Sequence, residues 1–535
     1  MDAEYWQYSV RDEPKFNEVV CSGYVLKSFE DVVPWLDRFI RSTASSFPDN
    51  FKYRGISVPG PFEQYQRNVL NKDVKREFDI ARSDLFLADL EFEFHDKGDI
   101  KTIRREIWLP FARQGNTMMI KGSLATIHPV VADRLVSVTQ DGLFFIIQRA
   151  KFNLDKRDYT VLKDGDIFTG VMLEAYLHND AGGKKANDKW ASPTTGHYLF
   201  AKYGVVETFQ RYYNTEVYVC TSDELDPRYD PDLHYKITSR DRHGRRKLQR
   251  DTDFVMIVPR EEFDTQPGFV NLVVSFFYAT DHYNVSFTFG DIDRPEDWLK
   301  TLAYAIFREK SNLALQLTKI QKHMDSLEDY IDEMTAEIIL EEGLENINTI
   351  YDLLVYANDE VIDLMKNTDV GSMWGKHLMV KRYALSSITF QIINLSWELK
   401  KDKDQLTYKK VKWLLGRYLH PNSFLGITKN HGEKTNVQYP GDNMLFKHTL
   451  ISVRQIDAVM TANGKSKINV DDPGYHLHPS IFDSGSMVNF PKPNPDGRTK
   501  LNPFITTSES GKILPNPKYY RMLKDEVGSE IGFDN

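Results

Sequence analysis

Cysteine is almost missing from this chain of 535 residues, where it occurs only as Cys21 and Cys220. Two thiols are too few for the disulfide framework that holds small secreted domains together. They are also too few for a zinc site built from cysteine ligands. The cysteine usage therefore indicates a reducing compartment.

Hydrophobic runs long enough to cross a membrane are also lacking, since no apolar stretch approaches about 20 residues. The first residues, Met1-Asp2-Ala3-Glu4, are acidic, whereas a signal peptide begins with basic residues that precede an apolar segment. We therefore expect a soluble protein that is either intracellular or packaged in a particle.

An excess of positive charge is the third absence. The chain carries 68 Lys and Arg against 77 Asp and Glu, which gives a formal net charge of −9. Proteins that bind nucleic acid on their own are usually basic, so the charge argues against a free-standing DNA-binding protein. It does not exclude a subunit of a larger complex that shares a basic channel. The length suits about three domains.

The most informative stretch that is present runs from Leu109 to Ile127. Gly115 and Gly122 bracket an apolar, β-prone run, Thr117–Ile120, that is too short for a helix. The pattern predicts the end of one strand, a turn at 114–116, a short strand over 117–120, and a second turn at 121–122. A helix or a strand then begins.

Alternating residues predict a further strand over residues 85–94. Its apolar positions fall on one face and its carboxylates on the other, as is typical of a half-buried antiparallel strand. The carboxylates are Asp89, Glu91 and Glu93. A solvated strand face explains them, and a metal cluster is the alternative.

Helical spacing of apolar residues occurs in three regions, which are 20–45, 311–365 and 384–399. Thr407 is placed to cap one more helix, with Val411, Leu414 and Leu415 inside. Strands and helices mixed in this way predict an α+β fold of several domains with antiparallel sheets.

Three stretches contain residues that could suggest a phosphate or metal site, but each lacks the spacing or the ligands that such a site needs. Residues 181–185 lack the spacing of a phosphate-binding P-loop and predict an exposed turn. Residues 221–234 collect carboxylates without the glycine and ligand spacing of an EF-hand. His476, His478 and Asp483 show no further zinc ligand. We expect this chain to bind no metal ion or other cofactor.

The densest basic run is Arg240–Arg250, which holds Arg245, Arg246 and Lys247. Cations at this density can bind the phosphates of nucleic acid. A solvated hairpin tip centred on His243-Gly244 is the alternative.

Four stretches, in this order along the chain, resemble segments from the N-terminal half of the β subunit of multisubunit DNA-directed RNA polymerases. In the first, Pro110-Phe111 and Gly115-Asn116-Thr117 correspond to a Pro-Leu pair and an Asn-Gly-Thr turn, and 118–123 to the strand and turn that follow. Leu124-Ala125 replace the family's Glu-Arg. The second stretch matches the basic residues that precede a long helix, and its residues are Gly375, Lys376, His377, Lys381 and Arg382.

The third stretch, 441–459, resembles the fork region of β. Thr449-Leu450 match a Thr-Leu pair, Arg454 matches the first of two arginines, and Gln455 replaces the second. The resemblance implies that this segment contacts template DNA or nascent RNA through Lys447, His448, Arg454, Gln455 and Asp457. For Arg454 alone, a salt bridge at a core edge is the alternative.

The fourth stretch keeps a Pro-x-x-x-Pro-acid-Gly pattern of the family in Pro491, Pro495, Asp496 and Gly497. Together the four matches imply a protrusion-like part over 1–136 and an inserted lobe-like domain over 137–308. A helical return to the protrusion over 309–425 would follow, and 426–535 would hold the fork-like region and the start of the next β domain. Residues 20–135 and 370–460 would pack as one domain.

The resemblance also implies what the chain leaves to its partners. RNA synthesis needs two Mg²⁺ ions held by carboxylates, and no triplet of closely spaced aspartates here could build that site. The lysine segment of the C-terminal half of β is missing too. We therefore expect a subunit without catalytic residues, with Mg²⁺ bound by a partner subunit.

The matches are similar to the split β subunits of giant bacteriophages. The partners would be a C-terminal β-like subunit, β′-like subunits, template DNA and nascent RNA, with no membrane. The location would be the host cytoplasm after infection, or the virion. The alternative is a phage structural or ejection protein, or another scaffold, without a role in transcription.

Overall fold

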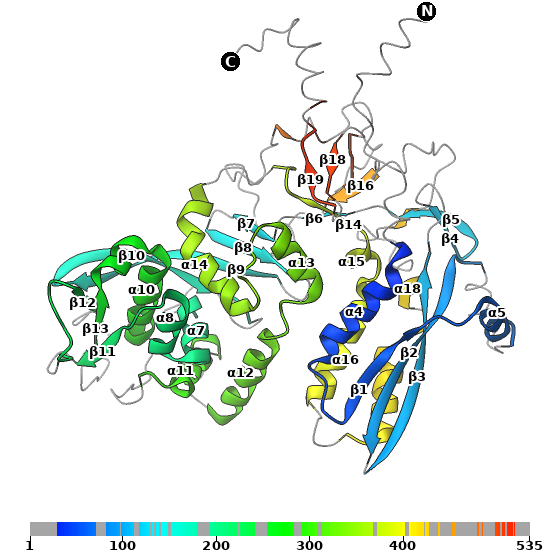
Figure 1. Cartoon of the computed structure of the whole chain (residues 1–535), viewed down its shortest axis with the longest axis horizontal. Coiled ribbons are helices and arrows are strands. Elements are labelled where there is room, and N and C mark those ends of the chain that lie inside the picture. The colour runs from blue at the N-terminus through cyan, green and yellow to red at the C-terminus, as the bar shows by residue number, and fades with distance from the viewer. Residues whose placement is uncertain are drawn as a thin grey trace, which may run out of the picture. The chain divides into compact units, whose positions relative to one another are not determined.

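The computed structural model describes most of the chain in separate ranges, which form two compact units. The described residues are 29–70, 82–96, 98–111, 117–127, 130–132, 135–138, 141–147, 151–178, 192–221, 225–240, 254–282, 292–307, 313–366, 372–401, 406–421, 423–426, 437–438, 452–455, 479–480, 484, 498–502, 505–508, 511–516 and 518. Unit 1 comprises 1–134 together with 371–535, and unit 2 comprises 135–370 (Figure 1). Helices and antiparallel sheets occur in both units, which confirms the predicted α+β class.

The main sheet of unit 1 is antiparallel and has the strand order β1-β2-β3. Its strands are β1 (Phe51–Ser57), β2 (Leu85–Asp96) and β3 (Asp99–Pro110). Strand β2 includes the predicted strand over 85–94. On its inner face Leu90, Phe92 and Phe94 are buried, as the alternation predicted.

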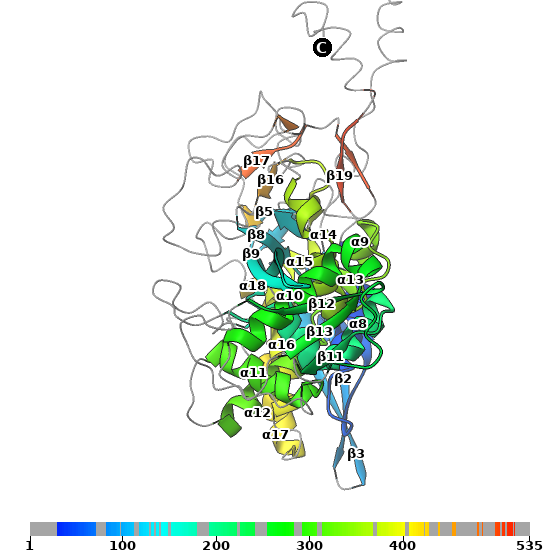
Figure 2. The same ribbon diagram turned by 90° about the vertical axis from the view of Figure 1, so that its left-hand side faces the viewer.

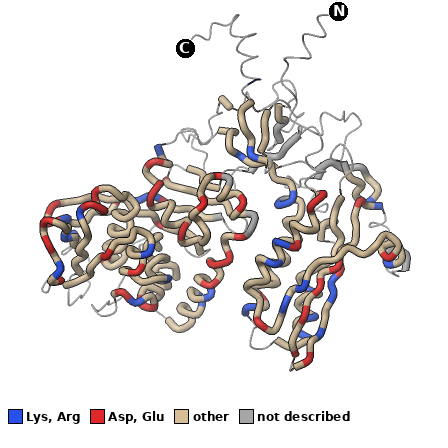
Figure 3. The backbone as a smooth tube through the Cα atoms, in the orientation of Figure 1, with Lys and Arg blue, Asp and Glu red and all other residues tan. Residues whose placement is uncertain are grey.

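One face of this sheet, which we call its outer face, carries the three carboxylates, and acidic and basic residues both occur along its strands (Figure 3). Each of the three carboxylates has an arginine partner. Asp89 accepts hydrogen bonds from Arg67, Glu91 pairs with Arg104, and Glu93 pairs with Arg54. Arg67 belongs to α5 (Pro61–Leu70) and Arg54 to β1. Asp89 is buried, and Glu91 and Glu93 are half-buried, so this face is less solvated than the alternation predicted. All three carboxylates are paired with arginines, so the metal alternative has no support here.

Helices pack on this sheet directly and through one another. Helix α4 (Val32–Ala44) contacts β1, and α17 (Tyr408–Tyr418) contacts β2 and β3. Helix α16 (Ser386–Lys401) contacts both α4 and α17 (Figures 1 and 2). The predicted apolar stripe of α16 is buried, and the hydroxyl of Thr407 caps α17 by accepting the N–H of Lys410 at 3.3 Å. The short helix α15 (Lys381–Ala384) directly precedes α16 in the sequence, and the short helix α18 (Ser423–Gly426) contacts both α16 and β3.

The predicted hairpin over 117–127 is present. Strands β4 (Thr117–Ile120) and β5 (Ser123–Ile127) pair antiparallel. Lys121 and Gly122 form the two-residue turn, and both have positive φ, 51° and 82°. This conformation is the one that a tight hairpin turn prefers, and glycine adopts it without strain. The stretch after the turn is therefore a strand, which the sequence had left open between strand and helix.

Unit 2 combines a sheet with a group of helices that cover it. The sheet order is β11-β13-β12-β9-β8-β7, and β10 also pairs with β9. Its strands are β7 (Val136–Val138), β8 (Gly142–Ile146), β9 (Lys151–Lys163), β10 (Asp166–Ala175), β11 (Tyr218–Thr221), β12 (His234–Ser239) and β13 (Phe254–Pro259). Its helices are α7 (Thr195–Tyr203), α8 (Val205–Tyr213), α9 (Arg260–Thr265), α10 (Pro267–His282), α11 (Pro295–Phe307), α12 (Leu313–Leu327), α13 (Glu333–Glu341) and α14 (Ile350–Lys366).

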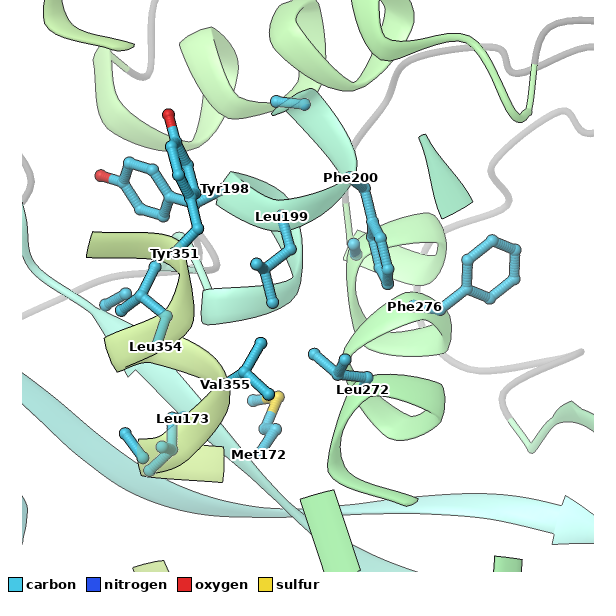
Figure 4. Packing of buried hydrophobic residues seen from close by; sticks show 14 of the residues in the cluster. Met172, Leu173, Tyr198, Leu199, Phe200, Leu272, Phe276, Tyr351, Leu354 and Val355 are labelled. Carbon is cyan, nitrogen blue, oxygen red and sulfur yellow. The ribbon is translucent and has the colours of Figure 1, made fainter. Parts of the chain in front are cut away.

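The core of unit 2 lies where α7, α10 and α14 meet β10 (Figure 4). Leu199, Leu272, Leu354 and Leu173 come from these four elements and are fully buried. Helix α10 is apolar around its whole circumference, which is typical of a helix enclosed by its neighbours. Unit 2 therefore has its own hydrophobic core.

The units divide the predicted 309–425 segment. Helices α12, α13 and α14 belong to unit 2, whereas α16 and α17 belong to unit 1. Residues 20–135 and 370–460 fall almost entirely within unit 1. The assignment of the four segments as protrusion-like, lobe-like and fork-like domains stays a prediction.

Candidate nucleic-acid interface

A four-stranded sheet in unit 1 joins the segments that carry the sequence motifs, and we call it the junction sheet. Its order is β14-β6-β16-β17 (Figures 1 and 2). The strands are β6 (Val130–Ala132), β14 (His377–Met379), β16 (Ser452–Gln455) and β17 (Arg498–Lys500). Strand β6 follows the first motif stretch, β14 and β16 lie within the second and third, and β17 follows the fourth. The sheet thus holds strands from the second and third stretches together with strands that closely follow the first and the fourth.

The register shows how far apart in sequence these partners are. Strand β6 pairs antiparallel with β14, Leu378 opposite Val131, and parallel with β16, Gln455 opposite Val131. Strand β16 pairs antiparallel with β17. A parallel pair cannot be closed by a tight turn. The sheet therefore depends on the packing of the whole of unit 1.

A second set of backbone hydrogen bonds holds the β14 segment from its other side. Gly375 N–H donates to Ile513 O at 2.9 Å, and Ile513 N–H donates to Lys376 O at 2.7 Å. Leu378 N–H donates to Gly511 O at 2.8 Å. Ile513 begins β19 (Ile513–Leu514), which pairs with β18 (Thr506–Thr507). The β14 segment is thus an internal strand with partners on both sides.

The first motif stretch is tied to the same region through its hairpin. Strand β15 (Val437–Gln438) pairs with β5 at the register Val437 opposite Ile127. The third motif stretch begins only a few residues after β15, at Gly441. The hairpin is therefore paired with a strand that lies shortly before the third stretch in the sequence.

The basic residues of the second stretch are either buried in unit 1 or paired with a carboxylate of unit 1. Lys381 Nζ contacts both carboxylate oxygens of Asp31, at 2.8 and 2.7 Å, and Asp31 is the N-cap residue of α4. Lys376, His377 and Arg382 are buried. These side chains are therefore enclosed by unit 1 or paired within it and are not presented to a ligand. Residues 377–379 form a strand, so the sequence interpretation of this stretch as a lead into a helix missed β14.

Two of the predicted contact residues, Arg454 and Gln455, lie in β16. Lys447, His448, Asp457, Arg245, Arg246 and Lys247 lie outside the described residues. The structure thus gives Arg454 and Gln455 a place in the register of the junction sheet, and their contact with nucleic acid stays a prediction.

The register adds two residues that the sequence interpretation missed. Arg498 lies opposite Arg454, and Lys500 lies opposite Ser452. Like charges at directly opposed positions destabilise a sheet. The sequence contains a hint of this pairing in Arg498-Thr499-Lys500, where basic residues alternate with a threonine. The hint can be interpreted only when the partner strand β16 is known.

Other candidate chemistry in the described residues is structural. Among them, no group of three or more His, Cys, Asp or Glu side chains could hold a metal ion. In the 221–234 stretch, hydrogen bonds from Arg228 lower the pKa of Asp226 to about 2. Burial lowers the pKa of His197 and of His323 to about 3, so both are neutral, and His197 Nδ1 accepts the N–H of Thr194 at 3.0 Å in a capping box. Among the helices that the structure describes, none is long and apolar enough to span a membrane.

Comparison with protein families gives a match over nearly the whole length. The model of the family described as "Non-virion RNA polymerase subunit" matches residues 4–527. This chain belongs to the non-virion RNA polymerase subunit family. No curated protein matches the sequence.

Membership in the non-virion RNA polymerase subunit family decides between the two hypotheses from the sequence. The chain is a subunit of a viral type of RNA polymerase, and other polymerase subunits are its partners. The name of the family indicates action in the infected cell, and packaging in the virion has no support. The scaffold alternative has no support from this comparison either.

Proposed function

We propose that this RNA polymerase subunit corresponds to the N-terminal half of β and that it forms one jaw and the fork of a split polymerase. The observation that carries the proposal is the junction sheet. The four β-like stretches follow one another over nearly 390 residues, from Leu109 to Gly497, and the strands within or beside them pair in this one sheet. Stretches that matched by chance would have no reason to do so.

The division into units gives a second argument. The resemblance predicted that residues 20–135 and 370–460 pack together around an inserted domain. The first and last parts of the chain form unit 1, and 135–370 form unit 2 with its own core. In this proposal unit 1 is the protrusion with the fork, and unit 2 includes the lobe.

The proposed role is to hold nucleic acid and not to catalyse. Strand β16 is enclosed between β6 and β17, so its backbone is fixed on both sides. A fixed strand can present Arg454 and Gln455 at a constant position beside the fork-like segment, which lowers the entropic cost of each contact. The Mg²⁺ ions and the carboxylates that hold them belong to partner subunits.

Co-purification from infected cells tests the proposal. A tagged copy of the full chain should bring down a chain with the lysine segment of the C-terminal half of β and a chain with the aspartate metal loop of β′. The pooled fraction should make RNA from phage DNA. A matched preparation from uninfected cells that express the tagged chain is the control, and it should be inactive.

Two results would contradict the proposal in different ways. An active fraction in which another subunit carries the N-terminal β-like segments would remove the β-like assignment and keep the family. A fraction without polymerase subunits and without RNA synthesis would remove the transcription role.

A further inference from the structure

Helices α16 and α17 expose aromatic rings at the surface of unit 1. Phe390 and Trp397 on α16 are 54% and 46% exposed, and Trp413 on α17 is 55% exposed. Soluble proteins bury most of their tryptophan surface. Positions 390, 394, 397 and 401 lie on one stripe of α16, because they are three or four residues apart. The opposite stripe of α16 is buried.

The two exposed tryptophans lie at the same level of the helix pair. Gln391 Oε1 accepts the N–H of His420 at 3.3 Å, just beyond the end of α17, and Ser387 Oγ donates to Ser423 O at 3.0 Å. These contacts set an antiparallel register near the start of α16. Counting along both helices from there brings Trp397 to the level of Trp413.

The exposed stripe of α17 is cationic. Lys409, Lys412 and Arg417 are exposed, and within the described residues no ion pair joins them to a carboxylate. The helix sequence YKKVKWLLGRY contains no acidic residue. The guanidinium carbon of Arg417 lies 5.1 Å from the centre of the Trp413 ring. This stripe differs from the outer face of β1–β3, where each arginine named above has a carboxylate partner.

We infer that this surface binds single-stranded RNA. We call it the α16–α17 face and define it by Phe390, Trp397, Lys409, Lys412, Trp413 and Arg417. Lysine and arginine neutralise phosphates, and exposed aromatic rings stack on unpaired bases. Every RNA polymerase makes RNA that leaves as a single strand, so this occupant is present whenever the enzyme works. An acidic peptide would match the cations but would leave the aromatic rings without a specific role.

The inference rests on membership in the RNA polymerase family and is independent of the β-like assignment. Helix α17 packs on the β1–β3 sheet and α16 packs on α17, and none of the residues of the α16–α17 face belongs to the junction sheet. It would be a second nucleic-acid contact of the same subunit.

Binding of a fluorescent single-stranded RNA to the purified full chain tests the inference. The Trp397→Ala/Trp413→Ala variant should bind about tenfold or more weakly, which is the effect of losing base–aromatic stacking. The variant with Lys409, Lys412 and Arg417 replaced by Gln should lower the slope of log K against log salt by about 2, since single strands release about 0.7 counterions per phosphate contact.

A matched control removes similar side chains elsewhere on unit 1. Lys52 is exposed, and Phe62 and Tyr65 are 72% and 65% exposed. The Lys52→Gln/Phe62→Ala/Tyr65→Ala variant should bind RNA like the unchanged chain. All variants change exposed residues, so their thermal unfolding midpoints should stay unchanged, and the same assay detects any that do not fold.

Competition experiments distinguish single-stranded RNA from the other ligands that this face could bind. An unlabelled single-stranded RNA should displace the probe, and a duplex of the same sequence should compete poorly because its bases are already stacked. Unchanged binding by both variants would overturn the inference, and so would equal competition by the duplex. Tighter binding of single-stranded DNA would assign the face to DNA and overturn the assignment to RNA. Loss of polymerase assembly with RNA binding intact would assign it to a partner subunit.

Discussion

Replacing Val131 with proline is expected to unfold unit 1 and to leave unit 2 folded. Strand β6 is internal to the junction sheet, with β14 on one side and β16 on the other, and Val131 is 1% exposed. Proline has no backbone N–H and is confined to edge positions of sheets. The lost ladder hydrogen bond leaves a buried partner unsatisfied at a cost of about 1–3 kcal/mol, and the steric misfit of the ring in an internal strand adds to it. Together these are a large share of the stability of a typical domain.

Hydrogen exchange of the full chain measures this effect segment by segment. In the Val131→Pro protein, amide protection should be lost in residues 377–379 and 452–455 and kept in α10 and α14. The Val131→Ile control changes the side chain and keeps the N–H, so its protection should match that of the unchanged chain. Normal protection of β14 and β16 in the proline variant would show that the two strands do not depend on β6.

The Arg454→Ala substitution is expected to leave the polymerase assembled and to slow RNA synthesis. Arg454 lies opposite Arg498 in the junction sheet, and like charges at opposed positions destabilise a sheet. If Arg454 contacts a phosphate, as the fork assignment proposes, the phosphate would offset this repulsion. A hydrogen bond between charged groups contributes about 1.5–3 kcal/mol, so elongation should fall about tenfold or more. The measurement is the elongation rate of the purified complex on phage DNA.

Arg104→Ala is the matched control for this experiment. Arg104 is exposed and pairs with Glu91 at 3.5 Å on the outer face of β1–β3. Exposed ion pairs contribute about 0–1 kcal/mol, so this variant should transcribe normally. Elongation by the Arg454→Ala complex at the control rate would rule out the fork assignment. Failure of that complex to assemble would instead support the alternative in which Arg454 forms a structural salt bridge.

Much of the local structure of unit 1 could be predicted because its signals are local. The alternation in β2, the glycines around β4 and the cap at Thr407 each report the conformation of a few neighbouring residues. The structure has β2, β4 with the turn at Gly122, and the cap at Thr407, whereas the predicted turn at 114–116 lies outside the described residues. The fold class followed from the same patterns.

The junction sheet could not be predicted in this way. Strands β6, β14 and β17 contain three residues each, which is too short for an alternation to be recognised. Their partners lie hundreds of residues away, and the pairing is set by the packing of unit 1 and not by turns. For the same reason Arg498 was missed until its register with Arg454 was known.

The sequence was also silent on how the cations of the second motif stretch are used. Lys381 matched a basic residue of the family, and the structure shows that it forms an ion pair with Asp31, 350 positions earlier. The exposure of the tryptophans on α16 and α17 could not be predicted from the sequence either. A helical pattern shows which face is apolar, but it does not show which aromatic residues remain uncovered.

Crosslinking from position 455 tests the central claim most directly. A photoreactive amino acid at Gln455 of β16, in a polymerase stalled during elongation, would report what lies beside the junction sheet, and the same group at Lys52 on β1 serves as the control. We expect position 455 to crosslink to template DNA or nascent RNA near the downstream edge of the bubble, and position 52 to give no such product. Crosslinks from position 455 to protein alone, in a complex that is actively making RNA, would contradict the fork-like role of this subunit.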